Sequence, residues 1–322
     1  GTASLIFAET PFYAEMGGQV ADHGQIFDAA GNLVAQVTDV QKAPNGQPLH
    51  TVEVLAPIAL GQSYKLEIDH SRRHRVMKNH TATHLLHAAL HNVLGNHATQ
   101  AGSLNEVEFL RFDFTHFQAV TAEELRAIEQ EVNEKIWEAL AIETVETDID
   151  TAKEMGAMAL FGEKYGDVVR VVRVPDFSIE LCGGSHVVNT GQIGLFKIVG
   201  ESGVAAGVRR IEAITGRAAF TYAAEMSHMV QELSRKLKTR AEDLVAQMDK
   251  FMDERKSMQE QLRNFTTFRD HADAQKLLMG VQKIGDFHVV VGKANVDSMD
   301  ELRNIADLTC EKLEAGIVVL GA

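Results

Sequence analysis

Two short segments of the sequence carry side chains that could hold a metal ion. The first is His80-Thr-Ala-Thr-His84, and the second, about a hundred residues later, is Cys182-Gly-Gly-Ser-His186. Three imidazoles and one thiolate favour a tetrahedral zinc ion over magnesium or calcium. Neither segment completes such a shell alone, so one shared ion would make the intervening chain a single folded domain. The sequence therefore predicts a zinc site formed by His80, His84, Cys182 and His186.

The two halves of this predicted site need different backbone supports. His80 and His84 are four residues apart, so they share one face of a helix and can reach the same ion. The pair Gly183-Gly184 lets the backbone turn tightly beside an ion without Cβ clashes, and His186 returns beyond that turn. The first half therefore requires a helix, and the second requires a glycine turn.

The role of the zinc ion, and whether a metal binds at all, stay open at this point. Four protein donors close a structural shell, whereas three donors and a water make a catalytic one. A ligand that yields to water or substrate would turn the first kind into the second. Without a metal, the pattern would be a buried cysteine and histidine on a glycine turn. His87 and His91 extend the same helical stripe, and we interpret them as core or surface histidines.

The region around the two motifs mixes helices and strands. Apolar residues at helical spacing predict a helix over 72–94 that ends at Gly95. A second helix begins at Thr121, with Glu124 as its capping-box partner, and runs to about Ala141. Strands are expected at 107–114, 142–147, 168–174 and 193–199. This mixture is typical of an α+β fold.

Residues 1–66 are predicted to form β structure. Short apolar runs alternate with the turn segments Ala30-Gly31-Asn32 and Pro44-Asn45-Gly46. The strands are expected at 5–7, 34–40, 50–55 and 64–68. Several short strands at this spacing favour a small β-barrel.

The last third of the chain begins with a helical segment. No glycine or proline occurs between Gly216 and Gly280, and an apolar heptad stripe runs through Leu237, Ala241, Leu244, Met248, Phe251, Met258, Leu262 and Phe265. It predicts a long helix or helical hairpin that packs on itself or on another subunit. Strands at 287–291 and 317–320 then flank a helix at 298–313, as in a parallel βαβ unit. We expect this last domain to be truncated, and the start at Gly1 to be a cut from a longer protein.

Composition and charge narrow the classes of function. The net charge is −14, which argues against binding nucleic acid by overall attraction. It does not exclude local basic patches at 70–75, 209–210 and 235–238, whose alternative interpretation is solvated helix faces. The two cysteines, Cys182 and Cys310, do not form a disulfide framework, which favours a reducing cytoplasm. No apolar run is long enough to span a membrane, and no signal peptide opens the chain.

Five segments together resemble one known family. They are His80-Thr-Ala-Thr-His84-Leu-Leu-His, Leu181-Cys-Gly-Gly-Ser-His186, Thr10-Pro-Phe-Tyr-Ala-Glu-Met-Gly-Gly-Gln19, Gln100-Ala-Gly-Ser103 and Gly207-Val-Arg-Arg-Ile-Glu-Ala-Ile-Thr-Gly216. They resemble the editing region of alanyl-tRNA synthetase. The threonyl enzymes have a related domain, but the β region upstream and the heptad segment downstream favour the alanyl family. The chain departs from the family pattern at Ser185, usually threonine, and at Ala21, usually glycine.

The resemblance implies a multidomain α+β protein. Its parts would be a small β-barrel at 1–66, a zinc-containing editing (deacylase) domain at 67–216, a coiled-coil-like helical segment at 217–275 and a truncated α/β domain at 276–322. It implies hydrolysis of mischarged Ser-tRNA(Ala) and Gly-tRNA(Ala), and tRNA(Ala), especially its aminoacylated 3′ end, as partner. The parent protein would attach alanine to tRNA with ATP in a region absent here. Self-association would use the 217–275 helix.

The resemblance also implies that Thr83 and Gln100 line the amino-acid pocket. Serine differs from alanine by one hydroxyl, and a synthetic pocket discriminates such a change by only about 1–3 kcal/mol, so a second, hydrolytic site is needed. Because serine is the larger residue, that site must read the hydroxyl, and Thr83 is our candidate reader. Gln100 does not titrate, so it would orient water or the ester. Zinc would either generate hydroxide or position the substrate, and we favour positioning.

Two other functions remain open from the sequence. A free-standing trans-editing deacylase would have the β region and the metal domain, although the heptad segment and the βαβ tail argue against it. A non-catalytic tRNA-binding and dimerisation module with structural zinc would also explain the four donors, the heptad stripe and the basic clusters. A deacylation assay with seryl-tRNA separates an enzyme from a module.

Overall fold

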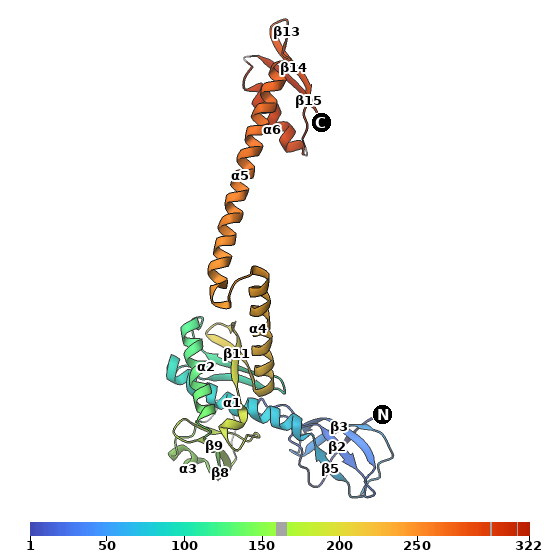
Figure 1. Ribbon diagram of the computed structural model, residues 1–322. Coiled ribbons are helices and arrows are strands. Elements are labelled where there is room, and N and C mark those ends of the chain that lie inside the picture. Colours follow the sequence, from blue (N-terminus) through green and yellow to red (C-terminus); the bar gives the residue numbers. More distant parts are fainter. Residues whose placement is uncertain (159–165, 297, 314) are drawn as a thin grey trace. The chain divides into compact units, whose positions relative to one another are not determined.

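The structure is a computed structural model, and it describes residues 1–158, 166–296, 298–313 and 315–322. The chain divides into two compact units, Gly1–Met226 and Ser227–Ala322. Both units contain helices and strands (Figure 1), so the predicted α+β class is confirmed. The finer division into four domains stays a prediction.

The first unit begins with a five-stranded antiparallel sheet. Its strands are β1 (Thr2–Leu5), β2 (Gly24–Phe27), β3 (Leu33–Lys42), β4 (Pro48–Val54) and β5 (Lys65–Ile68). Their order is β1-β4-β3-β2-β5, and within the described residues the outer strands β1 and β5 do not pair with each other. The predicted barrel is therefore wrong, because two four-residue edge strands leave the sheet open. Both predicted turns are confirmed, since each closes a hairpin next to β3.

Helix α1 (His70–Leu94) follows this sheet directly and carries the first metal motif. The Asp69 carboxylate accepts a hydrogen bond from the Arg72 amide at the N-terminus, and Gly95 ends the helix with φ 107°. Both ends agree closely with the predicted helix. The middle of α1 is buried on all sides, including its polar residues from Asn79 to His87. A helix of this kind must satisfy buried polar side chains with partners from several neighbouring elements.

A four-stranded antiparallel sheet and helix α2 (Ala122–Trp137) pack around α1. The strands are β6 (Gln100–Asn105), β7 (Leu110–Thr115), β11 (Phe196–Ala205) and β12 (Val208–Thr215), in the order β11-β12-β7-β6. Phe112, Phe114 and Phe196 are fully buried in the shared core. The capping box of α2 is confirmed. The helix ends at Trp137, before the predicted Ala141, and Ala139 adopts a positive φ of 51° that a helix cannot continue.

A smaller antiparallel sheet carries the second metal motif. It consists of β8 (Glu143–Asp148), β9 (Val168–Val174) and β10 (Ser178–Leu181), with the short helix α3 (Ile149–Glu154) against it. The strand predicted at 193–199 is correct only from Phe196, because Thr190–Ile193 form a 3-10 turn instead. Strand β10 ends at Leu181, so Cys182 is the first residue of the loop beyond the sheet.

Two helices account for the predicted heptad segment. They are α4 (Gly216–Leu237) and α5 (Leu244–Leu278), separated by a short 3-10 turn at Ala241–Asp243. Lys238 has a positive φ of 51°, which ends α4, so the continuous stripe predicted from Leu237 begins only at Leu244. Along α5 the stripe residues Met248, Phe251, Met258, Leu262 and Phe265 are exposed, and Leu244 is half-buried.

The second unit ends with a small sheet beside α6 (Met299–Cys310). Strands β14 (Phe287–Lys293) and β15 (Gly316–Gly321) are parallel, which confirms the predicted βαβ unit. A third strand, β13 (Gln282–Ile284), pairs antiparallel with β14 and was not predicted. Across the described residues, every helix is too short or too polar to cross a membrane.

Candidate metal centre

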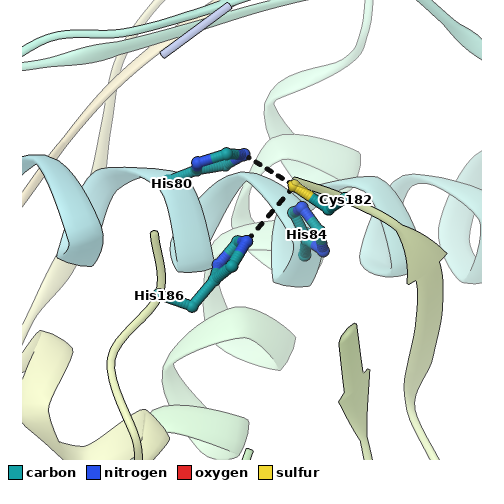
Figure 2. A group of neighbouring side chains, drawn as sticks. All are labelled: His80, His84, Cys182 and His186. Carbon is teal, nitrogen blue, oxygen red and sulfur yellow. Dashed lines mark hydrogen bonds between the residues drawn. The ribbon is translucent and has the colours of Figure 1, made fainter. Parts of the chain in front are cut away.

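The structure brings the four predicted metal-binding side chains together. One ligand atom from each of His80, His84, Cys182 and His186 lies within 4.8 Å of the others. Figure 2 shows the two histidines of α1 pointing at the side chains of the loop that follows β10. The Cys182 Sγ is 3.3 Å from His80 Nε2 and 3.3 Å from His186 Nε2. The helix and the glycine turn required by the sequence therefore converge on one point.

The outer nitrogen of each imidazole also has a neighbour. The Nδ1 atom of His80 lies 2.7 Å from Gln19 Oε1, and that of His186 lies 3.1 Å from Thr81 Oγ1. The Nδ1 atom of His84 is 3.6 Å from a Glu180 carboxylate oxygen. Metal-binding histidines commonly engage their second ring nitrogen in this way, which fixes the ring orientation. The donor set and its surrounding partners thus fit a zinc ion.

The second half of the site depends on the absence of a side chain at Gly184. A Cβ atom there would lie 2.1 Å from His80 Cε1 and 2.9 Å from Gln19 Oε1, so any larger residue would displace both. The Arg170 guanidinium holds the same turn by donating to the carbonyl oxygens of Cys182 and Gly184. The predicted need for glycine beside the ion is therefore met at this position.

The electrostatics favour a thiolate at the centre of the group. Burial raises the pKa of the Cys182 thiol, but the neighbouring imidazoles of His80, His84 and His186 outweigh it, and that pKa falls well below its ordinary value. Burial similarly lowers the pKa of His84, yet Glu180 and Cys182 raise it to about 9. For His186, burial and the neighbouring imidazoles lower the pKa to about 3. The Cys182 thiolate and the neutral His186 imidazole are the forms that bind a metal, and His84 would have to release its proton to join them.

A cavity of about 430 Å³ opens beside Cys182 and His80. Its described walls come from the N-terminal segment through Tyr13 and Met16, from β9 through Arg170, and from the glycine turn. Lys42 also lines it. The cavity thus gives access to the metal centre from a side that carries two basic residues.

The two predicted pocket residues lie on α1 and at the start of β6. Thr83 is buried on α1, with its hydroxyl 3.0 Å from the Asn79 carbonyl oxygen and 2.6 Å from Asn105 Oδ1. Gln100 is half-buried at the start of β6, and its Nε2 donates to Ser103 Oγ at 3.3 Å. Neither side chain lines the 430 Å³ cavity. Their roles in reading substrate stay predictions.

Sequence reasoning missed the residues that surround the four candidate ligands. Glu180 lies between His84 and His87, accepting from His87 Nδ1 at 3.0 Å, and its own pKa is lowered by these histidines against the effect of burial. Gln19 reaches His80 from the N-terminal segment. Glu180 lies on a strand two residues before Cys182, and side chains at this spacing point to the same side. This spacing could have indicated that Glu180 lies near the metal centre. Gln19 stands 61 residues from its partner, and no spacing rule connects them.

The comparisons with known proteins define the class of this site. Residues 169–212 match the family described as "Threonyl and Alanyl tRNA synthetase second additional domain", and residues 1–72 match "tRNA synthetases class II (A)". The matched residues include Cys182 and His186 but not His80 and His84, and they indicate a class II aminoacyl-tRNA synthetase with this additional domain.

The relatives narrow the class to one family. The chain is 65% identical to the alanine–tRNA ligase of Streptococcus sanguinis and 62% identical to that of Streptococcus gordonii, in both over 100% of its own length. It is 55% identical to the enzyme of Streptococcus thermophilus. The chain spans 37% of the length of these relatives. It belongs to the alanyl-tRNA synthetase family.

Proposed function

We propose that this chain is the editing part of an alanine–tRNA ligase, and that it hydrolyses the ester of Ser-tRNA(Ala) and Gly-tRNA(Ala) at a zinc centre. The observation that carries the proposal is the convergence of three imidazoles and one thiolate within 4.8 Å. The family match at residues 169–212 and the whole-chain identity to alanine–tRNA ligases support it. The parent protein would attach alanine to tRNA(Ala) with ATP elsewhere in its sequence.

His80, His84, Cys182 and His186 would hold the ion in this proposal. Bound zinc would supply a Lewis acid that orients the aminoacyl end. The Arg170 guanidinium would keep the Cys182–Gly184 turn in place while substrate enters, because it already donates to two carbonyl oxygens of that turn. With Lys42, it would also attract the negatively charged 3′ end of tRNA.

Thr83 and Gln100 would select and orient the substrate. The Thr83 hydroxyl has one hydrogen, which it donates to Asn79 or Asn105, so a lone pair remains to accept from a seryl hydroxyl. We expect Thr83→Val to lower the preference for Ser-tRNA(Ala) over Ala-tRNA(Ala) by about tenfold or more, because a site built to bond a hydroxyl rejects analogues that lack it. Rates of release of labelled serine and alanine measure this ratio. If the ratio is unchanged, Thr83 does not recognise the seryl hydroxyl.

A deacylation assay on the full chain tests the proposed activity. We expect Cys182→Ala to reduce hydrolysis of Ser-tRNA(Ala) by at least 100-fold and to leave the helical content unchanged, since one donor is lost from the shell. A zinc chelator should have the same effect on the wild type. Cys310→Ala is the matched control, because Cys310 is exposed at the end of α6 and should leave the rate unaltered.

One observation favours a second candidate function. Four protein donors form a closed shell of the structural type, which would suit a tRNA-binding module without turnover. In that case Cys182→Ala would weaken folding and tRNA binding, and the wild type would bind Ser-tRNA(Ala) without hydrolysing it. Turnover by the wild type that disappears in folded Cys182→Ala protein decides for the enzyme, whether it works within a ligase or as a free-standing deacylase.

A further inference from the structure

Gln19 is buried, with 1% of its surface exposed, at the point where the two halves of the metal centre meet. Its Oε1 lies 2.7 Å from His80 Nδ1 on α1 and accepts from the Ser185 amide at 2.9 Å. Its Nε2 donates to Ser185 Oγ at 2.8 Å. One side chain from the N-terminal segment therefore contacts both the helix and the glycine turn.

The contacts fix which way the Gln19 amide points. A backbone N–H can only donate, so the atom of Gln19 that faces the Ser185 amide must be the oxygen. The same oxygen faces His80 Nδ1, so that nitrogen must carry a proton to form the bond. In a neutral imidazole the other nitrogen, Nε2, is then unprotonated, and it faces Cys182 Sγ. This is the tautomer that a metal ion needs.

The other two imidazoles are less constrained by their neighbours. The Thr81 hydroxyl beside His186 Nδ1 can donate or accept, so it does not select a tautomer. The Glu180 oxygen beside His84 Nδ1 is 3.6 Å away, beyond ordinary hydrogen-bond distance. Only His80 thus has, beside its Nδ1, a neutral oxygen at short distance that can accept a hydrogen bond but cannot donate one.

A tight turn delivers Gln19 to this place. Gln19 and Met16 exchange backbone hydrogen bonds around Gly17 and Gly18, whose φ angles are 59° and 78°. The turn is attached to β6, because the Asn105 amide donates to the Gly18 carbonyl oxygen at 2.7 Å. A Cβ at Gly18 would lie 2.5 Å from the Ser103 carbonyl oxygen, so only glycine allows the turn to approach this strand.

We propose that Gln19 is a positioning residue of the metal centre, which holds His80 as its Nδ1-protonated tautomer and leaves Nε2 free to bind the ion. The inference rests on the proposed role of His80 as a zinc ligand. It gives the segment before the editing-type domain a direct part in the centre, through a side chain that touches neither ion nor substrate.

Three variants of the full chain test this role. Gln19→Met removes the acceptor at similar volume and should weaken zinc binding by about 10–100-fold, the usual effect of losing such a partner. Gln19→Glu keeps an oxygen that accepts from both donors and should bind zinc as the wild type does. Ser185→Ala keeps the Ser185 backbone amide and should also match the wild type. Competition with a chromophoric chelator measures each affinity.

The tautomer itself provides a readout that a purely structural role would not change. In metal-free protein with ¹⁵N-labelled histidine, the ring-nitrogen shifts of His80 should show a protonated Nδ1 in the wild type and in Gln19→Glu. Gln19→Met should show a mixture of tautomers. An unprotonated Nδ1 in the wild type overturns the inference, and this outcome is decisive even if Gln19→Met does not fold.

The affinities separate this inference from the proposed function. A wild type that does not bind zinc removes the metal centre itself. If the wild type binds zinc and Gln19→Met binds it as tightly as the wild type, only the proposed role of Gln19 is wrong. The same holds if Gln19→Glu binds zinc as weakly as Gln19→Met.

Discussion

At the scale of single residues, several buried histidines of the first unit have hydrogen-bond partners. His50 on β4 is an example away from the metal centre. His50 is fully buried, with its Nδ1 3.2 Å from the Leu5 carbonyl oxygen and its Nε2 2.8 Å from Thr10 Oγ1. Burial lowers the pKa of His50, although hydrogen bonds to backbone carbonyls oppose the shift. The folded N-terminal sheet therefore holds a neutral imidazole.

This neutral histidine makes the stability of the sheet depend on pH. Because its pKa is lower in the folded state than the unfolded value of about 6.5, the contribution to stability is complete above pH 6.5 and is lost as the pH falls below it. The loss is at most about 1.4 kcal/mol per pH unit. We expect His50→Gln, which keeps one donor and one acceptor, to reduce the fall in urea midpoint between pH 7.5 and 5.5.

His70→Gln is the matched control for this measurement, since His70 is exposed at the start of α1. It should leave the pH dependence of the midpoint as in the wild type. If His50→Gln showed the same fall in midpoint as His70→Gln, His50 would not be the group that titrates.

At the scale of elements, the Met16–Gln19 turn offers a sharp test of local geometry. Gly17 and Gly18 both have positive φ, but a Cβ at Gly17 would meet nothing within 4 Å, whereas one at Gly18 would meet the backbone of Ser103 at 2.5 Å. We expect Gly17→Ala to cost about 1–2 kcal/mol of unfolding free energy, the cost of a left-handed L-residue. Gly18→Ala should cost clearly more, and it should also weaken zinc binding because Gln19 moves.

Urea unfolding and chelator competition measure these two effects. Equal losses of stability in the two alanine variants, with zinc affinity unchanged in both, would mean that the turn does not depend on its approach to β6.

The elements that the sequence predicted well are those with local signals. Helix α1 was predictable because its apolar spacing is helical and Gly95 ends it, and α2 because Thr121 and Glu124 form a capping box. The strands β6 and β10 were missed, since short strands within mixed polar sequence have no periodicity long enough to recognise. The sequence of residues 1–66 predicts a barrel, whereas the sheet is open, because closure depends on pairing between strands far apart in sequence.

The candidate site was predictable only in its chemistry. Residue types and i,i+4 spacing indicated the four candidate ligands, and the structure brings them together. The partners Gln19, Thr81 and Glu180 depend on how three separate elements pack, which one sequence does not specify. Likewise, no local pattern indicated that the Thr83 hydroxyl would already be hydrogen-bonded.

At the scale of the whole molecule, the exposed apolar stripe of α5 supports the prediction of self-association. Met258, Leu262 and Phe265 are each about two-thirds exposed, and a row of this kind favours pairing with another helix. We expect the full chain to sediment as a dimer or larger species, and Leu262→Glu to shift it towards monomer because a buried unpaired charge is costly. Thr267→Glu introduces the same charge off the stripe and should not change the sedimentation coefficient.

Metal removal should be visible in the stability of the first unit. A ligand that binds only the folded state at about 1,000 times its Kd adds about 4 kcal/mol to the free energy of unfolding. Zinc should therefore raise the unfolding midpoint of the wild type, and magnesium should not, because the donors are nitrogen and sulfur. Cys182→Ala should not respond to zinc, whereas a response equal to that of the wild type would place the ion elsewhere.

The distance along the chain between the two halves of the metal centre has a consequence for synthesis. His80 and His84 leave the ribosome about a hundred residues before Cys182 and His186. At about 5–20 residues per second, this interval lasts roughly 5–20 s. During that time α1 has its histidines but not the thiolate, Glu180 or the glycine turn. The N-terminal segment with Gln19 has already emerged. Gln19, which we propose to select the tautomer of His80, is therefore available to His80 before Cys182 has been made.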